Sequence, residues 1–455
     1  MGPLTAIAVA ERDVEAANIR LVDIDPEHPH NWPMAKKVRV IMILGLMNIL
    51  ATVASSILSP AQAEIMEEFH IDKEVAILTT TLFLVGYIFG FLTFGPLSEK
   101  FGRKWPLIIG VTISALFELM PALGTNLATV LVGRFFAGLF GISPVAVMGG
   151  VVSDCFATEQ RGNAMAIAVA LMFSGPTFGP VFGGFIVASP LHWRWTMWVM
   201  IICGLGLALI AVVLFPETYP PIVLQRAQSC KASSLESPSE TEKEKQDSNS
   251  NLGQIAKLYL IRPFWLILTQ PILTLLTIYQ SLLYGILYLF YQSYPYTFGT
   301  LRGWPTGLNT LPLLGLITGI LLTTILMLLY NHLYFRHHSH DPTTGKFLPE
   351  ARLPPMILGG CLIPAGMFWY AWTATPSIPW ASPVCANLLI GSGMYLLFIQ
   401  GFSYIVDCFT GMANSAMGVN GAMRSVFGAA FPLFAGRMLA GLGVADATSV
   451  LGAVL

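Results

Sequence analysis

Eleven long apolar stretches run through this 455-residue chain and constrain its fold more than any other feature. A helix needs about 20 apolar residues to cross the roughly 30 Å hydrocarbon core of a membrane. Each stretch is close to that length or longer. They occupy residues 38–60, 75–97, 105–123, 127–152, 164–188, 195–215, 263–292, 307–332, 353–374, 381–404 and 413–437. The pattern predicts an all-α membrane protein.

A further apolar stretch begins near Val444 and ends with the sequence at Leu455. As a helix it would extend about 18 Å, which is too short to cross a bilayer. We therefore expect either a truncated twelfth helix or eleven full spans.

The composition agrees with lipid surroundings. Charged residues are 11% of the chain and hydrophobic residues 55%, whereas a soluble domain carries about 25% charge. The 24 basic and 25 acidic residues leave a net charge of −1. This balance excludes a basic nucleic-acid binder, whose footprint is a positive patch.

The sequence shows no constellation suited to an enzyme, a metal or a cofactor. The cysteines lack metal-ligand spacing, and His337, His338 and His340 share one polar loop, which favours a surface loop over a ligand set. No GxxxxGK[ST] motif for ATP occurs. We expect no enzyme and no bound metal or cofactor, so any energy would come from an ion gradient.

Basic residues orient the spans, because cytoplasmic segments carry an excess of Lys and Arg. With the N-terminus in the cytoplasm, 18 of the 24 basic residues fall on the cytoplasmic side, four outside and two within spans. The distribution predicts a multi-pass protein with a cytoplasmic N-terminus.

A polar stretch at 217–262 divides the spans six and six, counting the short last one. Its middle, 231–250, is rich in charge and lacks aromatic residues, so we expect a disordered tether. The predicted organisation is a cytoplasmic tail at 1–37, one half at 38–216, the linker at 217–262 and a second half at 263–455.

A faint repeat relates the halves. Asp154 in Ser-Asp-Cys-Phe ends the fourth span, and Asp407 in Val-Asp-Cys-Phe ends the fourth span of the second half. Both are expected on the inner face. Parallel repeats of this kind are one known plan for transporters.

Arg134 lies within the fourth span, where a cation is costly and therefore a functional candidate. We expect it to face the bundle interior and to seek a carboxylate or a water-filled cavity. Glu118 in the third span is a possible partner, although it could instead be solvated near the outer interface, and an ion pair could be purely structural. Arg424 in the eleventh span is a second candidate.

The loop between the second and third spans reads GPLSEKFGRK. Glu99 and Arg103 are four residues apart and could pair, and Glu99 could also latch the halves through a helix end. Alternatively, the basic residues of this loop could anchor it at the membrane interface by extending their charged ends into water. The candidate latch residues are Gly95, Glu99, Gly102, Arg103 and Lys104.

The fifth span carries glycines every four residues together with two prolines. Small residues let a neighbouring helix approach closely, and each proline removes a backbone donor and bends the helix. Packing explains this pattern as well as function does. The residues are Gly175, Pro176, Gly179, Pro180, Gly183 and Gly184.

Polar and aromatic side chains of the seventh span are candidates for a substrate cavity, since tyrosine rings offer π faces to apolar or cationic compounds. The candidates are Tyr279, Gln280, Tyr284 and Tyr288, with Asn48 of the first span. For Tyr291, Tyr294 and Tyr296 we favour an interfacial aromatic belt.

These motifs resemble the major facilitator superfamily. The loop at 95–104 resembles its signature between the second and third helices, and 175–184 resembles the fifth-helix signature of its drug:proton antiporters. Arg134 in Arg-Phe-Phe-Ala-Gly is similar to the fourth-helix arginine that the family links to proton coupling.

Further segments resemble fungal twelve-helix drug:proton antiporters, a family that includes polyamine and multidrug exporters. They are NWP at 31–33, PETYPP at 216–221, YGILY at 284–288 and PEARL at 349–353. Gln270 and Gln292 stand where relatives often carry Glu. The resemblance therefore gives less support to polyamine export, because dications favour carboxylates.

The resemblance implies a major facilitator fold, with two six-helix halves related by a pseudo-two-fold axis around a midplane cavity. It also implies a monomeric plasma-membrane exporter that exchanges protons for a small apolar or amphipathic drug, toxin or secondary metabolite, with Arg134 coupling protonation to the cavity. A nutrient or polyamine transporter of the same fold and a non-transporting membrane sensor are the alternatives.

Overall fold

The computed structural model describes residues 27–156, 158–225, 262–335, 348–409 and 413–455. Within these ranges the chain is helical and has no strand, and eleven helices are long and apolar enough to cross a membrane. The predicted all-α class and the number of full spans are confirmed. The tail at 1–26, most of the linker and the His337–His340 loop lie outside the described residues.

The first group of helices is continuous in sequence and carries the predicted amino-terminal spans. Short helices η1 (Pro29–Asn31), η2 (Ser59–Ala61) and α3 (Gln62–Phe69) flank α2. The spans are α2 (Met34–Ser56), α4 (Lys73–Lys100), α5 (Lys104–Phe117) with α6 (Leu119–Leu123), α7 (Leu127–Gly141) with α8 (Ser143–Cys155), α9 (Thr158–Ala188) and α10 (Arg194–Leu214).

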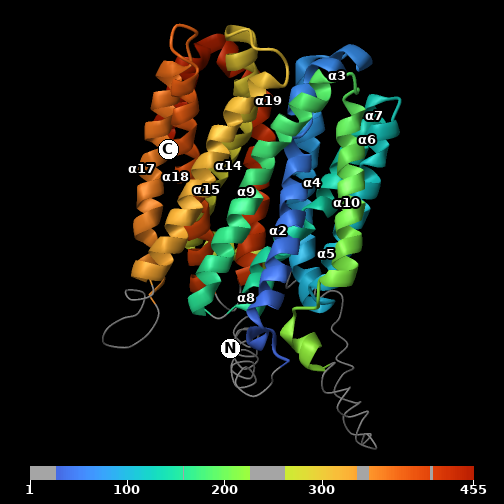
Figure 1. Ribbon diagram of the computed structural model, residues 1–455, viewed down its shortest axis with the longest axis vertical. Coiled ribbons are helices and arrows are strands. Elements are labelled where there is room, and N and C mark those ends of the chain that lie inside the picture. The colour runs from blue at the N-terminus through green and yellow to red at the C-terminus, as the bar shows by residue number, and fades with distance from the viewer. Residues whose placement is uncertain (1–26, 157, 226–261, 336–347, 410–412) are drawn as a thin grey trace, which may run out of the picture.

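The second group follows the linker and has more irregular ends. Its elements are α13 (Arg262–Thr269), α14 (Pro271–Tyr294), η5 (Pro295–Leu301), η6 (Leu308–Leu313), α15 (Leu314–Tyr330), η7 (Asn331–Phe335), η8 (Pro349–Arg352), α17 (Leu353–Thr373), α18 (Ala381–Cys408) and α19 (Ala413–Val454). In Figure 1 the two groups stand side by side with their helices roughly parallel.

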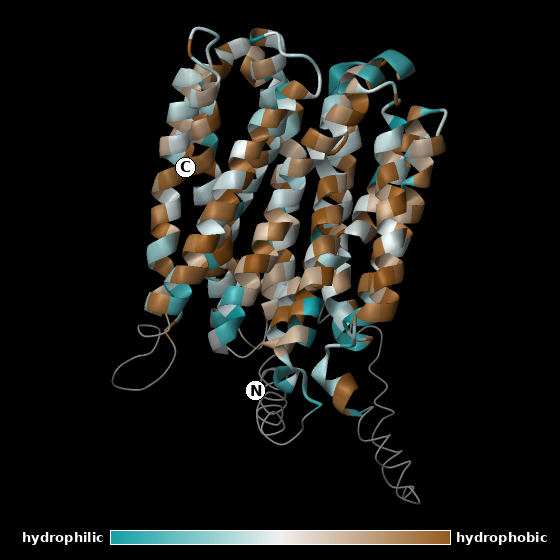
Figure 2. Ribbon diagram, in the orientation of Figure 1, coloured by the Kyte–Doolittle hydropathy of each residue, from teal (hydrophilic) through white to brown (hydrophobic). Residues whose placement is uncertain are grey.

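Apolar side chains cover the outside of the bundle. On α10, Ile202 is 64% exposed, Leu209 67% and Val213 73%, and Figure 2 shows hydrophobic residues along the full height of the outer helices. An apolar surface of this extent is stable only in lipid. The protein is therefore a multi-pass membrane protein.

Two spans are interrupted at positions that matter for the site. The third breaks at Glu118, between α5 and α6, and the fourth breaks at Ile142, between α7 and α8. Pro144 lies in the first turn of α8 and cannot donate a backbone hydrogen bond, which explains the second break. Glu118 thus sits at a helix junction inside the bundle.

Gly443 has φ 77° and divides α19 in two. This backbone conformation is strained for residues with a Cβ, so glycine is favoured at the turn. The following segment, from Val444, is helical and packs Val444, Ala447 and Leu451 into the core. The predicted short last helix is present, and the C-terminus lies part-way up the bundle (Figure 1).

The described part of the predicted linker is ordered. Residues 220–225 are helical, and Glu217 and Thr218 are buried against the first half. The beginning of this segment therefore belongs structurally to the first group of helices, because Glu217 bonds to the loop between α4 and α5. Residues 226–261 lie outside the described ranges.

Candidate functional site: two buried arginines and the contacts between the halves

Arg134 on α7 is completely buried and is held by three groups from other helices. Its Nη1 donates to Oε1 of Glu118 at 2.8 Å, its Nε to the carbonyl of Thr79 at 3.0 Å, and its Nη2 to the carbonyl of Ala54 at 2.7 Å. The guanidinium also lies over the ring of Phe83, with Cζ 4.1 Å from the centroid. The structure thus brings together Arg134 and Glu118, as the sequence suggested.

The Ala54 carbonyl is available because it lies in the last turn of α2, where carbonyls lack helical partners. Close packing lets Arg134 reach α4: a Cβ on Gly138 would lie 2.1 Å from the Phe83 carbonyl. Arg134 therefore connects α2, α4 and the α5–α6 junction. Its contacts extend beyond the ion pair with Glu118.

Glu118 is 2% exposed, so the alternative of a solvated residue at the outer interface is wrong. Its Oε2 has no hydrogen-bond partner in the described protein. Glu118 also lines a cavity of about 30 Å³ between α2, α5 and α10, shared with Ser114 and Gly204. This space is sufficient for a water molecule, so the carboxyl adjoins a place from which a proton could arrive.

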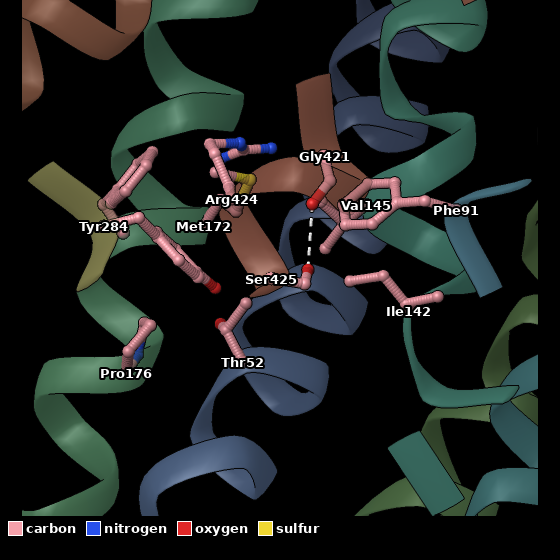
Figure 3. A pocket seen from close by; sticks show the side chains of 11 residues that line it. Thr52, Phe91, Ile142, Val145, Met172, Pro176, Tyr284, Gly421, Arg424 and Ser425 are labelled. Carbon is pink, nitrogen blue, oxygen red and sulfur yellow. Dashed lines mark hydrogen bonds between the residues drawn. The ribbon is translucent and has the colours of Figure 1, made fainter. Parts of the chain in front are cut away.

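Arg424 on α19 is also buried, with 3% of its surface exposed. It lines two small cavities, each of about 10 Å³, between the two halves. Figure 3 shows one of them, with Tyr284 and Arg424 on one side and Phe91 and Ile142 on the other. The predicted cavity residue Tyr284 lies here.

The remaining cavity candidates take different positions. The Tyr288 hydroxyl lies 2.6 Å from Ser55 Oγ of the other half and 3.4 Å from the Tyr284 hydroxyl. Gln280 donates to the Leu397 carbonyl and accepts from Asn420, so it joins helices of the second half.

Tyr279 and Asn48, the other two candidates for the substrate cavity, lie apart from Tyr284 and Tyr288. Tyr279 points toward α17, where its hydroxyl would lie 3.7 Å from a Cβ on Gly360, because five residues turn it about 140° from Tyr284. Asn48 is fully buried, and both of its side-chain amide atoms lack partners among the described residues.

An interfacial belt is the wrong interpretation for Tyr291 and Tyr294, which are 1% and 0% exposed. Tyr294 donates to Asn387 Oδ1 at 2.6 Å, and Tyr291 lies 3.3 Å from Thr177 Oγ1. The spacing of three residues at each step places both on the inner face of α14, together with Tyr288. Tyr296 is partly buried.

Helices α2 and α9 pack closely through the predicted glycine face. A Cβ on Gly175 or Gly179 would lie within about 2 Å of an atom of α2, and one on Gly183 equally close to Ile57, which directly follows α2. Pro180 has no backbone N–H and so leaves the Pro176 carbonyl without its helical donor. Ser56 of α2 donates to this carbonyl at 2.7 Å. The sequence predicts the free carbonyl, because it shows Pro180. It does not predict that Ser56 is the donor, because that contact depends on how α2 and α9 pack.

The loop at 95–104 forms a network at the end of the bundle where the described chain begins. Arg103 forms its ion pair with Asp154 at 2.9 Å, and not with Glu99 four residues earlier. Glu217 Oε1 accepts from the Arg103 backbone at 2.8 Å, and Ser98 Oγ accepts from Arg103 Nη1. Burial opposes the charged form, but Asp154 outweighs it, and the pKa of Arg103 is raised.

Tight geometry explains the other residues of this loop. Gly102 has φ 84°, and a Cβ there would lie 2.5 Å from Glu217 Oε2. The Lys104 backbone donates to the same carboxylate. Gly95, in contrast, has open space beside it.

The second half repeats this arrangement. Arg352, just before α17, forms an ion pair with Asp407 at the end of α18. Asp154 and Asp407 therefore each bind a buried arginine at the same end of the bundle, which agrees with the sequence repeat.

Hydrogen bonds connect the halves at several heights. Asn331 donates to Asn163 at the end where the described chain begins, and Arg437 pairs with Glu74 near the opposite end. Between them Tyr395 donates to the Ala166 carbonyl. The two cavities that Arg424 lines between the halves each have only about 10 Å³, so the halves are closed around Arg424 in this conformation.

The comparisons with known proteins agree with this architecture. An MFS-type transporter of Penicillium crustosum is 41% identical over 428 residues, covering 94% of this chain and 86% of the relative. A citrinin biosynthesis cluster MFS transporter of Monascus ruber is also 41% identical, with 94% and 85% covered. The solved human organic anion transporter MFSD10 shares the fold, with TM-score 0.63, 16% identity, and 92% and 97% of the two chains covered.

The family model of the Major Facilitator Superfamily matches residues 44–432. This range includes Arg134 and Arg424, both aspartates of the repeat and the glycine face of α9. The chain therefore belongs to the Major Facilitator Superfamily and is a transmembrane transporter, similar to fungal MFS transporters that include one of a citrinin biosynthesis cluster.

Proposed function

We propose that this transporter exports a small apolar or amphipathic compound and takes up protons in exchange. The buried pair of Arg134 and Glu118 carries the proposal. A carboxylate that is paired with a cation inside the membrane, and that adjoins space for a water, is a suitable proton-accepting group.

Protonation of Glu118 removes the negative charge that holds Arg134 Nη1. The guanidinium then redistributes its hydrogen bonds, including the one to the Ala54 carbonyl at the end of α2. The next residue, Ser55, contacts Tyr288 of the other half. A proton on Glu118 is thereby coupled to a contact between the halves.

The two halves, 38–216 and 263–455, would rock around the central cavities and expose them alternately to each side. The close contact of α9 with α2 keeps the first half rigid as it moves. The networks of Arg103 with Asp154 and of Arg352 with Asp407 stabilise the corresponding end of each half.

The end that carries these networks would face the cytoplasm, because it also carries Lys36, Lys37 and Lys100. We propose a monomer in the plasma membrane with a cytoplasmic N-terminus. A protease or antibody that reaches a tag at the N-terminus only after the cells are permeabilised would support this orientation.

The direction of transport is tested in cells with and without the protein, loaded with fluorescent apolar and amphipathic compounds. We expect faster loss of at least one compound from expressing cells, and a protonophore should abolish the difference. Greater accumulation in expressing cells would show import and contradict the proposal.

A matched pair of variants tests the coupling. Glu118→Gln removes the titratable group at nearly constant size and should eliminate the protonophore-sensitive export. Glu67→Gln makes the same change at an exposed position on α3 and should leave export unchanged. Normal coupled export by Glu118→Gln would remove Glu118 from the mechanism.

A further inference from the structure

Arg424 is a buried cation without a counter-ion among the residues that the structure describes. In the described parts of the chain, no carboxylate forms an ion pair with it and no acceptor receives a hydrogen bond from it. Its Nε is buried and unpaired. Because the five N–H donors of an arginine need acceptors when water is excluded, this side chain is prepared for a partner that the described residues do not supply.

Aromatic rings surround the guanidinium instead. Its Cζ lies 4.7 Å from the ring centroid of Phe402, 5.4 Å from Tyr284, 5.6 Å from Phe398 and 5.9 Å from Phe91. Ring faces attract the positive charge, but they offer no lone pairs to the N–H groups. The rings therefore hold Arg424 in the membrane interior and leave its hydrogen-bonding capacity free.

The site lies between the two halves, where an alternating-access transporter binds its cargo. Phe91 and Met172 come from the first half, and Tyr284, Phe402 and Arg424 from the second. In this conformation the two cavities each have about 10 Å³, close to the space of one water. A larger cargo would enter when the halves separate.

We infer that Arg424 binds the carboxylate of an organic anion whose apolar or aromatic body lies against the surrounding rings. This inference rests on the proposed transport function and defines its substrate class. The guanidinium fork matches a carboxylate in two parallel hydrogen bonds. A neutral cargo would leave the charge uncompensated, and a cationic cargo would be repelled by it.

The lining of the two cavities supports an anion over a cation. Apart from Arg424, the described residues that line them are apolar or carry only hydroxyl groups. No acidic side chain is available there to receive a cationic drug or a polyamine. Tyr284 adds a hydroxyl group, whereas the hydroxyls of Thr52 and Ser425 donate to the carbonyls of Asn48 and Gly421 in their own helices.

An anionic cargo also changes the energetics of export. A membrane potential that is negative inside favours outward movement of one negative charge by roughly fiftyfold in concentration per 100 mV. Exchange for an incoming proton adds a second charge moving in the favourable direction. Export of such an anion is therefore electrogenic.

Three probes with one ring system and different charge test the site. They are 9-anthracenecarboxylate, 9-anthracenecarboxamide and 9-(aminomethyl)anthracene, titrated by fluorescence onto the purified full chain. We expect the carboxylate to bind most tightly and the ammonium most weakly. Arg424→Met should weaken carboxylate binding about 10- to 150-fold, as expected for a hydrogen-bonded charge, and should change carboxamide binding little.

Arg39→Met is the matched control, because Arg39 also lies on a long helix, α2, but is exposed and away from the two cavities. It should bind all three probes as the unaltered protein does. Equal binding of carboxylate and carboxamide to the unaltered protein would overturn the inference, and so would a carboxylate preference retained by Arg424→Met. If that variant does not fold, the charge preference of the unaltered protein and of Arg424→Lys decides.

This experiment separates the inference from the proposed function, because binding needs neither a gradient nor flux. Carboxylate-selective binding without proton-driven movement in vesicles would support the anion site and contradict proton-coupled export. Proton-driven movement of neutral compounds without carboxylate selectivity would support export and contradict the anion site.

Discussion

Each half of the molecule buries an arginine on one of its long helices, Arg134 on α7 and Arg424 on α19, and the surroundings of these two differ in one respect. Arg134 is 0% exposed and Arg424 3%, so both have lost nearly all contact with solvent. Arg134 binds a carboxylate and two backbone carbonyls, whereas Arg424 lies among four aromatic rings without an ion pair in the described residues. One arginine is satisfied within the protein and the other is not.

This difference indicates a division of labour. A satisfied pair responds when its carboxylate takes up a proton, and it transmits that event to the helices it joins. An unsatisfied cation responds when a ligand brings negative charge. Burial of the charge is unfavourable for both arginines. Only for Arg424 can a bound cargo with a negative charge offset this free energy.

The largest difference should appear when each arginine is removed. Arg134→Met leaves Glu118 buried without its partner, which costs about 3–5 kcal/mol in comparable pairs. We expect a clearly lower thermal midpoint of the purified protein. The double variant Arg134→Met/Glu118→Leu should recover much of this stability without recovering proton-driven export, and an unchanged midpoint for Arg134→Met alone would contradict the pairing.

Gly179→Leu tests whether export requires the close packing of α9 against α2, the helix whose Ala54 carbonyl binds Arg134. A Cβ at this position already lies 2.1 Å from Ser56 Oγ, and the larger side chain would push α2 away. Overpacking of this kind costs about 1–3 kcal/mol, and export should fall with it. Gly206→Leu is the control, since nothing lies within 4 Å of its Cβ. Equal export by both variants would show that the α2–α9 contact is dispensable.

The paired variants Asp154→Asn and Asp407→Asn compare the halves at one end. Each replaces a charged acceptor of a buried arginine by a neutral one, which should cost about 1–3 kcal/mol. The pKa of Arg103 is raised by Asp154, so Arg103 stays charged and its pair persists at alkaline pH. We expect similar losses of thermal stability in both variants. A loss confined to one of them would show that the structural repeat is not a functional one.

The smallest effect on stability should come from Arg424→Met. No carboxylate in the described structure loses a partner, so we expect the unfolding free energy to change by less than about 1 kcal/mol or to increase. The thermal midpoint of the purified variant measures this. A fall as large as that of Arg134→Met would mean that Arg424 has a counter-ion within the protein.

Much of the fold follows from the sequence because lipid imposes strong rules. The lengths of the apolar stretches determine the spans, and the prolines and glycines at 175–184 determine where α2 can approach. The positions of Asp154 and Asp407 were informative for the same reason: equivalent places in a repeat serve equivalent contacts.

The sites were less predictable, because charge pairing depends on helices that are distant in sequence. The spacing of Glu99 and Arg103 suggested a local pair, but the helices bring Asp154 closer. The aromatic positions of α14 suggested a membrane belt, although the tertiary packing buries Tyr291 and Tyr294. Phe398 and Phe402 gave no signal, since their proximity to Arg424 arises only when α18 and α19 pack together.

The most direct measurement is flux of 9-anthracenecarboxylate from proteoliposomes with the potential clamped by potassium and valinomycin and a pH gradient imposed. The account predicts that the gradient accelerates flux through the unaltered protein. Glu118→Gln should bind the probe but no longer respond to the pH gradient, and Arg424→Met should bind the probe more weakly. Flux that ignores the gradient in the unaltered protein, or a Glu118→Gln variant that still follows it, would contradict the division of labour between the two arginines.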